Sequence, residues 1–368
     1  MKEAGAADTP GQPDKADKPG KTAALAYDQS AGAGDEAARD VFAQLDAAEA
    51  ALGELGWRVR RVAVGLDLGK AKRDLAAPET DLVVNLVESL AGSDRLQTVF
   101  VMAMEEWGVP FTGSGSTAMF LSNDKLLTKR LLDRRGLPVA DCVFPVPGGG
   151  PGFFPASAGG AHPRPGTWIV KPLAAHASLG MTDDSVFEAG DAEEILGRIR
   201  AESGRRGLDC FSERYIEGRE FNLSLLGEPG GGARVLPPAE IEFVDFPAGK
   251  PRIVGYAAKW DEASGEYGKT ARSFAAADRE PRLAEALRRT ATDAWAALGL
   301  SGYARVDFRV DREGKPWILE INANPCLSPD AGFAAAAERA GWSFADMLGR
   351  IVDEALGRRR HDFSHAIS

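Results

Sequence analysis

Residues that could do chemistry gather near the C-terminal end of this 368-residue chain, in two segments that alternate as strands do. In "YARVDFRV" (303–310), Asp307 interrupts an apolar pattern. In "WILEIN" (317–322), Glu320 stands among Ile and Leu residues, and Asn322 follows on the same face because side chains alternate along a strand. A strand that only filled a core would need none of these polar groups, so we expect a binding site here.

The intervening turn, "DREGKP", indicates that the two segments form a hairpin. We take Val310 to pair with Trp317, and antiparallel partners then keep a constant sum of residue numbers. The pairs that follow are Asp307 with Glu320 and Arg305 with Asn322. Carboxylates on directly opposed residues repel each other, because their Cβ atoms are about 4.5–5.5 Å apart. A cation removes this repulsion, and oxygen ligands used together with substrate phosphates suit Mg²⁺.

A plainer interpretation stays open for the hairpin alone. In it, the polar face is solvated, and Asp307 and Glu320 pair with Arg305 and Arg309, which share the face of Asp307. No metal would then be needed. The rest of the chain has to decide between these two interpretations.

The N-terminal part of the chain has the pattern of a small α/β domain. "DLVVNLVE" (81–88) is a continuous apolar run, typical of a parallel strand that is buried on both faces. Strands are also expected at 22–27 and 57–65, and the apolar spacing of 35–55 and 96–107 predicts helices. Strand, helix, strand, strand and helix in this order favour an α/β fold.

A second region begins at Asn123. The amphipathic segment 124–138 is expected to be a helix that Gly136 and Pro138 end, and the Gly/Pro-rich stretch 145–166 is expected to be an inserted loop. The other expected elements are strands at 167–172, 209–216, 219–227 and 237–246, the hairpin at 303–322, and helices around 281–298 and 343–357.

Composition excludes several classes of function. The net charge of −10 argues against a nucleic-acid partner, which needs a concentrated basic surface. The cysteines Cys142, Cys210 and Cys326 show no paired spacing, which argues against a disulfide framework and fits a cytoplasmic protein. No apolar run reaches the ~20 residues of a membrane helix, so no membrane partner is expected. Residues 1–21 have the composition of a disordered tail and lack the apolar segment of a secretory signal.

Several motifs together resemble the ATP-grasp superfamily, and within it the D-alanine–D-alanine ligase group most closely. Any one of them alone is more often a set of surface charges, but they occur in the order of that family between about residues 81 and 355. The motifs are "NDKLLTKRLL" (123–132), "TWIVKP" (167–172), "HASLGM" (176–181), "SERYIEGREF" (212–221), and the hairpin pair "ARVDFRV" and "LEINANP".

The resemblance implies a nucleotide site. By it, the phosphates of ATP would contact two lysines and a small-residue loop, the adenine would meet a glutamate and a backbone position, and the ribose would meet a second glutamate. In that order the residues are Lys125, Lys171, Ser178, Gly180, Glu213, Ile216 and Glu220.

The resemblance also implies the catalytic and metal residues. Lys259 matches a lysine that reaches the γ-phosphate, and Arg305 matches the arginine that stabilises an acyl phosphate and the tetrahedral intermediate. Asp307, Glu320 and Asn322 match the ligands of two Mg²⁺ ions, for which Mn²⁺ is an alternative.

The implied fold class combines α/β and α+β parts, with an N-terminal Rossmann-like (preATP-grasp) domain followed by a two-lobed ATP-grasp fold. After the tail, we expect the first domain at 22–112, a central lobe at 113–213 that holds the 145–166 insertion, and a C-terminal lobe with the metal site at 214–360.

The substrate half of the pattern departs from the family. Family members hold an amino group with a glutamate after the first strand, and no clear match lies in 27–40. Other positions where the family has Ser, Tyr, Gly and Ser carry Ala177, Trp260, Cys326 and Ala331. These changes point to a substrate other than D-alanine.

Two residues near these departures have open roles. His176 could contact phosphate or substrate, although an exposed loop histidine is the plainer interpretation. Cys326 invites comparison with a nucleophile, but the expected reaction needs none, which favours a packed thiol.

The resemblance therefore implies an ATP-dependent ligase that joins a carboxylate to an amine through an acyl phosphate, with release of ADP and phosphate. Its partners would be small amino-acid or peptide substrates, and a homodimer follows by analogy only. One alternative is an authentic D-alanine–D-alanine ligase. Another, of a different class, is a non-catalytic ATP-binding regulator, against which Arg305 speaks because a sensor would not need it.

Overall fold

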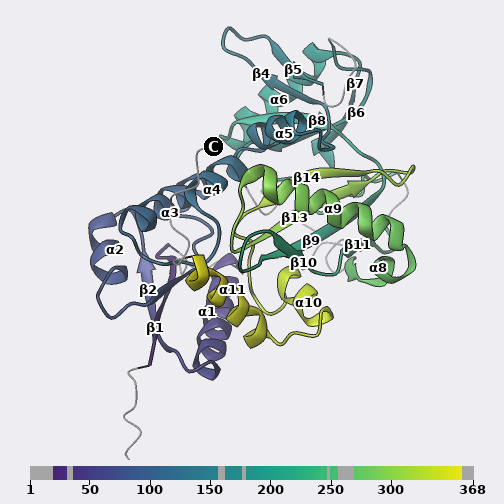
Figure 1. The fold of residues 1–368 in the computed structure, drawn as a ribbon. Coiled ribbons are helices and arrows are strands. Elements are labelled where there is room, and N and C mark those ends of the chain that lie inside the picture. The colour runs from purple at the N-terminus through teal and green to yellow at the C-terminus, as the bar shows by residue number, and fades with distance from the viewer. Residues whose placement is uncertain are drawn as a thin grey trace, which may run out of the picture.

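A computed structural model shows how the chain arranges these segments. It describes residues 20–30, 36–155, 162–175, 180–246, 249–255 and 269–358. For residues 36–39 it describes the backbone only. Within these residues the strands form three sheets, and each sheet with its helices forms one lobe of the molecule (Figure 1).

The first lobe is built on a parallel sheet in the order β2-β1-β3. Its strands are β1 (Thr22–Asp28), β2 (Arg58–Val64) and β3 (Leu82–Asn85), and its helices are α1 (Glu36–Glu54), α2 (Leu68–Leu75), η1 (Asp94–Leu96) and α3 (Gln97–Glu106). This confirms the predicted α/β pattern. Helix α2 was not predicted; it begins where the Asp67 side chain accepts a hydrogen bond from the Lys70 amide, at 2.8 Å.

Strand β3 is shorter than the predicted strand at 81–88. It ends at Asn85, whose side-chain oxygen accepts a hydrogen bond from the Val87 amide at 3.2 Å and so turns the chain. The apolar run was read correctly as buried, but the asparagine within it ends the strand. Glu88 consequently lies in the loop after β3 and not in the sheet.

The second lobe holds an antiparallel sheet in the order β5-β4-β8-β6-β7. Its elements are β4 (Cys142–Pro145), β5 (Pro151–Phe154), β6 (Gly166–Pro172), η2 (Asp183–Ser185), β7 (Val186–Ala189), α6 (Ala192–Arg206) and β8 (Cys210–Arg214). Helix α6, also not predicted, packs Ile195 and Ile199 with Trp168 of β6 in a separate small core.

The Gly/Pro-rich stretch 145–166 is not all loop. Residues Pro151–Phe154 form β5, which pairs with β4 at the edge of the sheet. The turn between them uses Gly148 and Gly149, both at positive φ, where glycine is the favoured residue. The glycines were read as a sign of loop, whereas they allow the chain to reverse and add a strand.

The third lobe contains the largest sheet, in the order β12-β11-β9-β13-β14 with β10 also on β9. Its strands are β9 (Arg219–Gly227), β10 (Ala233–Val235), β11 (Ala239–Phe243), β12 (Thr270–Ser273), β13 (Tyr303–Val310) and β14 (Pro316–Asn322). Its helices are α8 (Ala275–Arg279), α9 (Pro281–Leu298), α10 (Gly332–Arg339) and α11 (Phe344–Arg358). Helix α11 returns to the first lobe, where Leu348 and Ile351 share a core with Leu45 and Leu52 of α1.

The predicted hairpin is confirmed, but its register near the turn is not. Val310 pairs with Pro316, so the assumed pairing of Val310 with Trp317 is wrong. The register shifts between Asp307 and Phe308, as at a β-bulge, where one strand carries an extra residue. Beyond the shift, the predicted pairs are observed as Arg305 with Asn322 and Asp307 with Glu320.

Two further helices connect the lobes. Helix α4 (Ser116–Asn123), which was not predicted, is followed directly by α5 (Lys125–Arg134). Both contact β14, and α5 also contacts α9. Helix α5 begins where the Asp124 side chain accepts a hydrogen bond from the Leu127 amide, at 2.8 Å. The segment after α5 stays on β14, because the Ile318 amide donates to the Pro138 carbonyl, at 2.8 Å.

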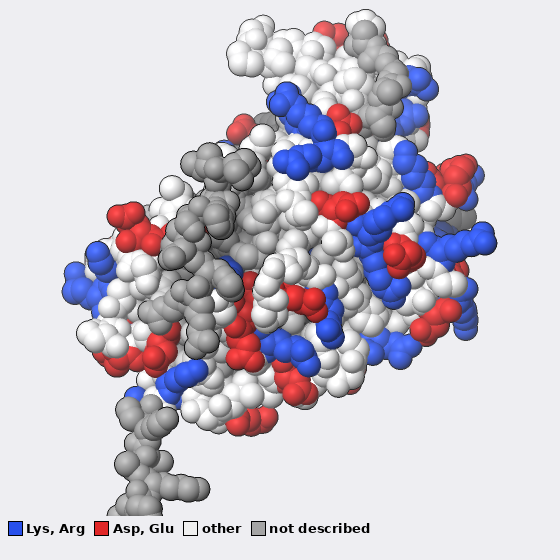
Figure 2. All heavy atoms as spheres, in the orientation of Figure 1, with Lys and Arg blue, Asp and Glu red and all other residues white. Residues whose placement is uncertain are grey.

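On the face drawn in Figure 2, Lys and Arg side chains are interspersed with Asp and Glu side chains. All three cysteines are free. Among the helices of the described residues, none has both the length and the apolarity that a membrane span requires.

Candidate active site

The hairpin brings Asp307 and Glu320 face to face. Asp307 is only 5% exposed, and it accepts hydrogen bonds from Arg305 Nε at 2.7 Å and Nη2 at 2.8 Å. The side-chain amide of Asn222, on β9, donates to the same carboxylate at 2.8 Å. The pairing of Asp307 with Arg305 is thus observed, but the solvated face that the plainer interpretation assumed is wrong for Asp307.

Glu320 is the accessible carboxylate of the hairpin. Its side chain is 30% exposed, and one of its oxygens lies 3.6 Å from Lys125 Nζ. Asn322 lies two residues on, opposite Arg305. In the part of the chain that the structure describes, no group of three or more His, Cys, Asp or Glu side chains could hold a metal ion. Two carboxylates and one amide do fit Mg²⁺, which takes few protein ligands when substrate phosphates supply others.

Arg305 stays cationic in this environment. Burial by itself would lower the pKa of its guanidinium, but the charges of Asp307 and Glu320 raise that pKa well above its ordinary value. An arginine held by one carboxylate beside a second is a preorganised cation. Such a group can stabilise an oxyanion without having to reorganise.

Helix α5 places Lys125 beside the end of β6. The Lys125 amide donates to the Leu173 carbonyl at 3.1 Å, and its Nζ donates to the Ala175 carbonyl at 2.6 Å. Lys125 therefore lies between the start of the predicted phosphate loop and Glu320, where it can neutralise negative charge.

Lys171 and Glu213 are brought together on neighbouring strands of the central sheet. Lys171 Nζ lies 2.5 Å from one oxygen of Glu213, and Lys129 Nζ of α5 lies 2.7 Å from the other. Burial alone would raise the pKa of Glu213, but the two lysine charges outweigh burial and lower it. Lys129 was missed in the sequence, although its spacing of four residues from Lys125 puts both on one helix face.

Arg309 organises the segment that was predicted to meet adenine and ribose. Its buried guanidinium donates to the carbonyls of Ile216 and Gly218, each at 3.0 Å, and lies 3.3 Å from Glu220. Arg309 was considered only as a partner for the hairpin carboxylates. Its true partners lie on β9 and the preceding turn, which a strand pattern cannot reveal.

Several predicted positions lie outside the described residues. These are Ser178 and Lys259 among the site residues, and His176, Ala177 and Trp260 among the departures from the family. Gly180 is described, with a φ of 65°, a left-handed conformation that favours glycine.

A second polar cluster lies where three distant segments meet, beside the hairpin. Asp40 and Gln44 come from α1, Glu88 follows β3, and Cys326 and Ser328 follow β14. Gln44 Nε2 donates to Glu88 at 3.4 Å, and Asp40 contacts both Ser328 Oγ and Cys326 Sγ. Burial, followed by the charge of Glu88, raises the pKa of the Cys326 thiol, so this cysteine is a neutral thiol, as the plainer interpretation expected.

The motif "LEINANP" has two amides with different surroundings. Asn324 is buried, accepts a hydrogen bond from the Tyr303 hydroxyl at 2.7 Å, and donates to the Val87 carbonyl at 3.0 Å. It therefore fastens the hairpin to the first lobe. Because Val87 precedes Glu88, this contact also brings Glu88 toward Arg305, whose charge acts on the pKa of Glu88.

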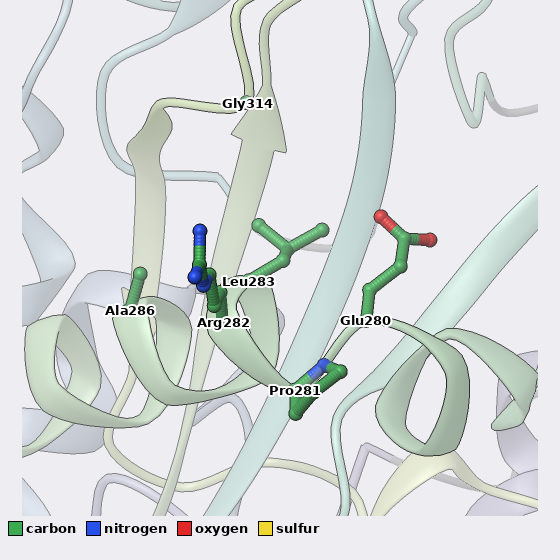
Figure 3. A pocket seen from close by; sticks show the side chains of 6 residues that line it. All are labelled: Glu280, Pro281, Arg282, Leu283, Ala286 and Gly314. Atoms are coloured by element: carbon green, nitrogen blue, oxygen red, sulfur yellow. The ribbon is translucent and has the colours of Figure 1, made fainter.

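A surface hollow between α9 and the β13–β14 turn lies apart from these residues (Figure 3). Its lining consists of Glu280, Pro281, Arg282, Leu283, Ala286 and Gly314. Glu280 is already paired with Arg219, at 2.9 Å, and none of the predicted site residues lines the hollow. We assign it no role.

The sequence of this chain is similar to those of known ligases. The family model described as "D-ala D-ala ligase C-terminus" matches residues 167–353, about half of the chain. A D-alanine–D-alanine ligase of Bordetella pertussis is 33% identical to this chain over 289 residues, which are 78% of this chain and 82% of that protein.

Solved structures share the fold at low identity. A D-alanine–D-alanine ligase of Bacillus anthracis, solved in complex with ATP, aligns with a TM-score of 0.66 at 17% identity and covers 93% of this chain and 99% of its own. The VanG D-Ala:D-Ser ligase of Enterococcus faecalis aligns with a TM-score of 0.63 at 17% identity, over 91% and 99%. These likenesses confirm the predicted ATP-grasp fold behind an N-terminal α/β domain.

Proposed function

This chain belongs to the D-alanine–D-alanine ligase family of ATP-dependent ligases that form carbon–nitrogen bonds, and from this premise we propose which groups it joins and which of its residues act. The terminal phosphoryl group of ATP passes to the carboxylate of one amino acid or small peptide. The nitrogen of an amine then attacks the acyl carbon, phosphate leaves, and the amine loses a proton. The products are an amide, ADP and phosphate.

The observation that carries this proposal is the position of Arg305. Asp307 forms a salt bridge with it, and Glu320 lies opposite Asp307 on the neighbouring strand. A carboxylate is a poor electrophile until it is phosphorylated, and attack on the acyl phosphate builds up an oxyanion. A fixed cation at that point stabilises the charge as it develops. A regulator that only bound ATP would have no need of such an arginine.

In this proposal ATP binds between the central and the largest sheets. Lys125 and Lys171 face its phosphates, with Ser178, Gly180 and Lys259 acting at the phosphate end. Glu213 and the backbone of Ile216 meet the adenine, and Glu220 meets the ribose. Support comes from Arg309, which joins Ile216 to Glu220, and from the salt bridge between Lys171 and Glu213.

Mg²⁺ fits the same hairpin. Asp307, Glu320 and Asn322 would hold it, and we propose two ions, as in the family resemblance. When bound, the metal neutralises charge on the phosphates. Because Asp307 also accepts both hydrogen bonds of Arg305, the residues themselves keep the arginine aligned with the metal side of the site.

On the substrate side, we propose that Glu88 and Asp40 face the ammonium group of an amino-acid substrate. Glu88 is an exposed residue, yet desolvation by its close neighbours, followed by the charge of Asp40, raises the pKa of its carboxyl group to about 7. A bound ammonium group would relieve this repulsion between carboxylates. An amino acid or small peptide other than D-alanine remains our first choice, with D-alanine as the alternative that the names of the relatives favour. A cytoplasmic location belongs to the same proposal.

A screen for ADP release, with ATP, Mg²⁺ and a panel of amino acids and small peptides, tests the function. Release with D-alanine alone would identify a D-alanine–D-alanine ligase. Release only with other acids and amines would support a changed substrate. If ATP binds but no pair of substrates releases ADP, the regulator becomes the better interpretation.

A further inference from the structure

Three charged side chains meet in the interior where α5, β6 and β8 come together. Lys129 and Lys171 each contact a different oxygen of Glu213, at 2.7 and 2.5 Å. Lys129 is 2% exposed and Glu213 is 1% exposed. Two cations thus share one buried anion, so the cluster carries an extra positive charge when all three groups are ionised.

In this arrangement Lys171 has two possible anionic partners, the carboxylate of Glu213 and the phosphates of ATP. Lys171 is the residue proposed to contact the phosphates of ATP, yet its Nζ also contacts Glu213. If Lys171 turned toward phosphate and Glu213 had no other partner, a buried carboxylate would lose its only cation. Leaving one member of a buried ion pair uncompensated is strongly unfavourable.

We infer that Lys129 is a positioning residue that keeps Glu213 compensated, so that Lys171 is free to exchange this carboxylate for the phosphates of ATP. The inference rests on the proposed function and extends it. By this inference, Lys171 pairs with Glu213 until ATP binds. When ATP binds, Lys129 and Glu213 remain as a neutral buried pair, and the surplus charge passes to the phosphates.

A second contact explains why Lys129 can hold this place. Its Nζ also donates to the carbonyl of Ile318 at 3.1 Å, two residues before Glu320 on β14. Lys125, one helical turn earlier, reaches Glu320 itself. Helix α5 thus directs two lysines toward β14. The hydrogen bond to Ile318 holds Lys129 in place, and its charge compensates that of Glu213.

The test compares ATP with adenosine in the full-length protein. In Lys129→Met, Glu213 has only Lys171, so binding of phosphates must break the last pair. We expect ATP affinity, measured by calorimetry with Mg²⁺, to fall by at least about tenfold, or about 1.4 kcal/mol. Adenosine has no phosphates to draw Lys171 away, so its affinity should change far less. Arg134→Met, which removes an exposed cation from the same helix, is the matched control and should leave both affinities unchanged.

Two further variants separate this effect from damage to the fold. Lys129→Arg keeps the charge and should recover most of the ATP affinity. The double variant Lys129→Met/Glu213→Gln lacks the stranded carboxylate, so its loss of ATP affinity relative to Glu213→Gln alone should be far smaller than the loss that Lys129→Met causes in the wild-type protein. In kinetics, Lys129→Met should raise the KM for ATP and leave the KM for the amine unchanged.

Equal losses for ATP and adenosine, or an undiminished effect of Lys129→Met in the Glu213→Gln background, would overturn the inference and make Lys129 a structural residue only. Wild-type protein that binds no ATP would instead refute the proposed function. Because that result is read from the unmodified chain, the two failures are distinguishable.

Discussion

The proposed nucleotide side and the proposed substrate side of the site surround a glutamate with opposite charges. Glu213, between two lysines, has a lowered pKa, because their charges outweigh its burial. Glu88, beside Asp40, has a pKa raised to about 7, first by desolvation and then by that neighbouring carboxylate. The first environment is complete without a ligand. The second would be improved by a cation, which is what an ammonium group supplies.

The two sides also differ in how they are built. On the nucleotide side, Glu213, Glu220 and Asp307 lie on strands, and cross-strand or helical partners hold them. On the proposed substrate side, Glu88 and Cys326 lie in the loops that follow β3 and β14, and Cys326 contacts Asp40 of the first lobe. Strand register conserves a geometry, whereas loops change without disturbing a sheet. This difference fits the observation that the residues proposed to bind nucleotide match the family pattern, whereas the residues proposed to face the substrate depart from it.

The largest effect should come from the metal side. Glu320→Gln removes one negative charge from the carboxylates of Asp307 and Glu320, which are proposed to bind Mg²⁺. We expect turnover to fall by a factor on the order of 10²–10³ or more. The measurement is ADP release under saturating substrates. Glu313→Gln, in the exposed turn of the same hairpin, is the control. Near-normal turnover of Glu320→Gln would refute the metal assignment.

A large effect is also expected at the centre of the nucleotide side. Arg309→Gln should strand Glu220 and release the carbonyls that Arg309 holds. We expect the free energy of unfolding to fall by about 3 kcal/mol, as for a broken buried pair, together with a rise of roughly tenfold in the KM for ATP. Chemical denaturation and steady-state kinetics measure the two. Unchanged ATP kinetics would mean that the 215–220 segment does not bind nucleotide.

A smaller effect, confined to the substrate side, is expected for Glu88→Gln. Glu88 ionises near pH 7, so affinity for an ammonium group should rise as the pH rises through 7. The variant should lose this pH dependence and raise the KM for the amino acid whose ammonium group is bound by roughly tenfold, about 1.4 kcal/mol, without changing the KM for ATP. Asp40, Gln44, Cys326 and Arg305 are the groups that act on Glu88, and they remain in the variant. An unaltered pH profile would exclude Glu88 from substrate binding.

The same carboxyl group also affects stability, with a definite sign. Because its pKa is higher in the fold than the ordinary value of 4.5, the folded state binds the proton more tightly. The stability that this provides is present at low pH and is lost as the pH rises through about 7. Glu88→Gln should therefore remove this decline in unfolding free energy between about pH 4.5 and pH 7, which thermal melts at several pH values can follow.

The smallest effect should be that of Cys326→Ser. The thiol has a raised pKa and contacts Asp40 and Ser328, so it stays protonated and contributes packing. We expect turnover within about twofold of wild type, since a conservative replacement of such a group costs well under 1 kcal/mol in the barrier. A loss of activity beyond a hundredfold would contradict the packed-thiol interpretation.

The parts of the site that lie on one strand or one hairpin could be predicted, because side chains alternate along a strand. The period of two in "YARVDFRV" and "WILEIN", together with an assumed register, predicted the observed pair of Asp307 with Glu320. The assumed pairing of Val310 with Trp317 failed because the ladder shifts its register between Asp307 and Phe308. A shift of this kind is a compromise between the turn and the two strands, and a pattern in either strand alone does not contain it.

Contacts between distant segments could not be predicted in this way. Lys129 gave no sign that it would meet Glu213, 84 positions further on, and nothing in "LEINANP" showed that Asn324 would contact Val87 of the first lobe. The sequence by itself determined the fold class, the hairpin and the family, because these follow from periodicity and from motifs in order. Only the tertiary structure decided which charges share a partner. Burial makes that choice, since a charge removed from water must be matched by whatever the packing brings within reach.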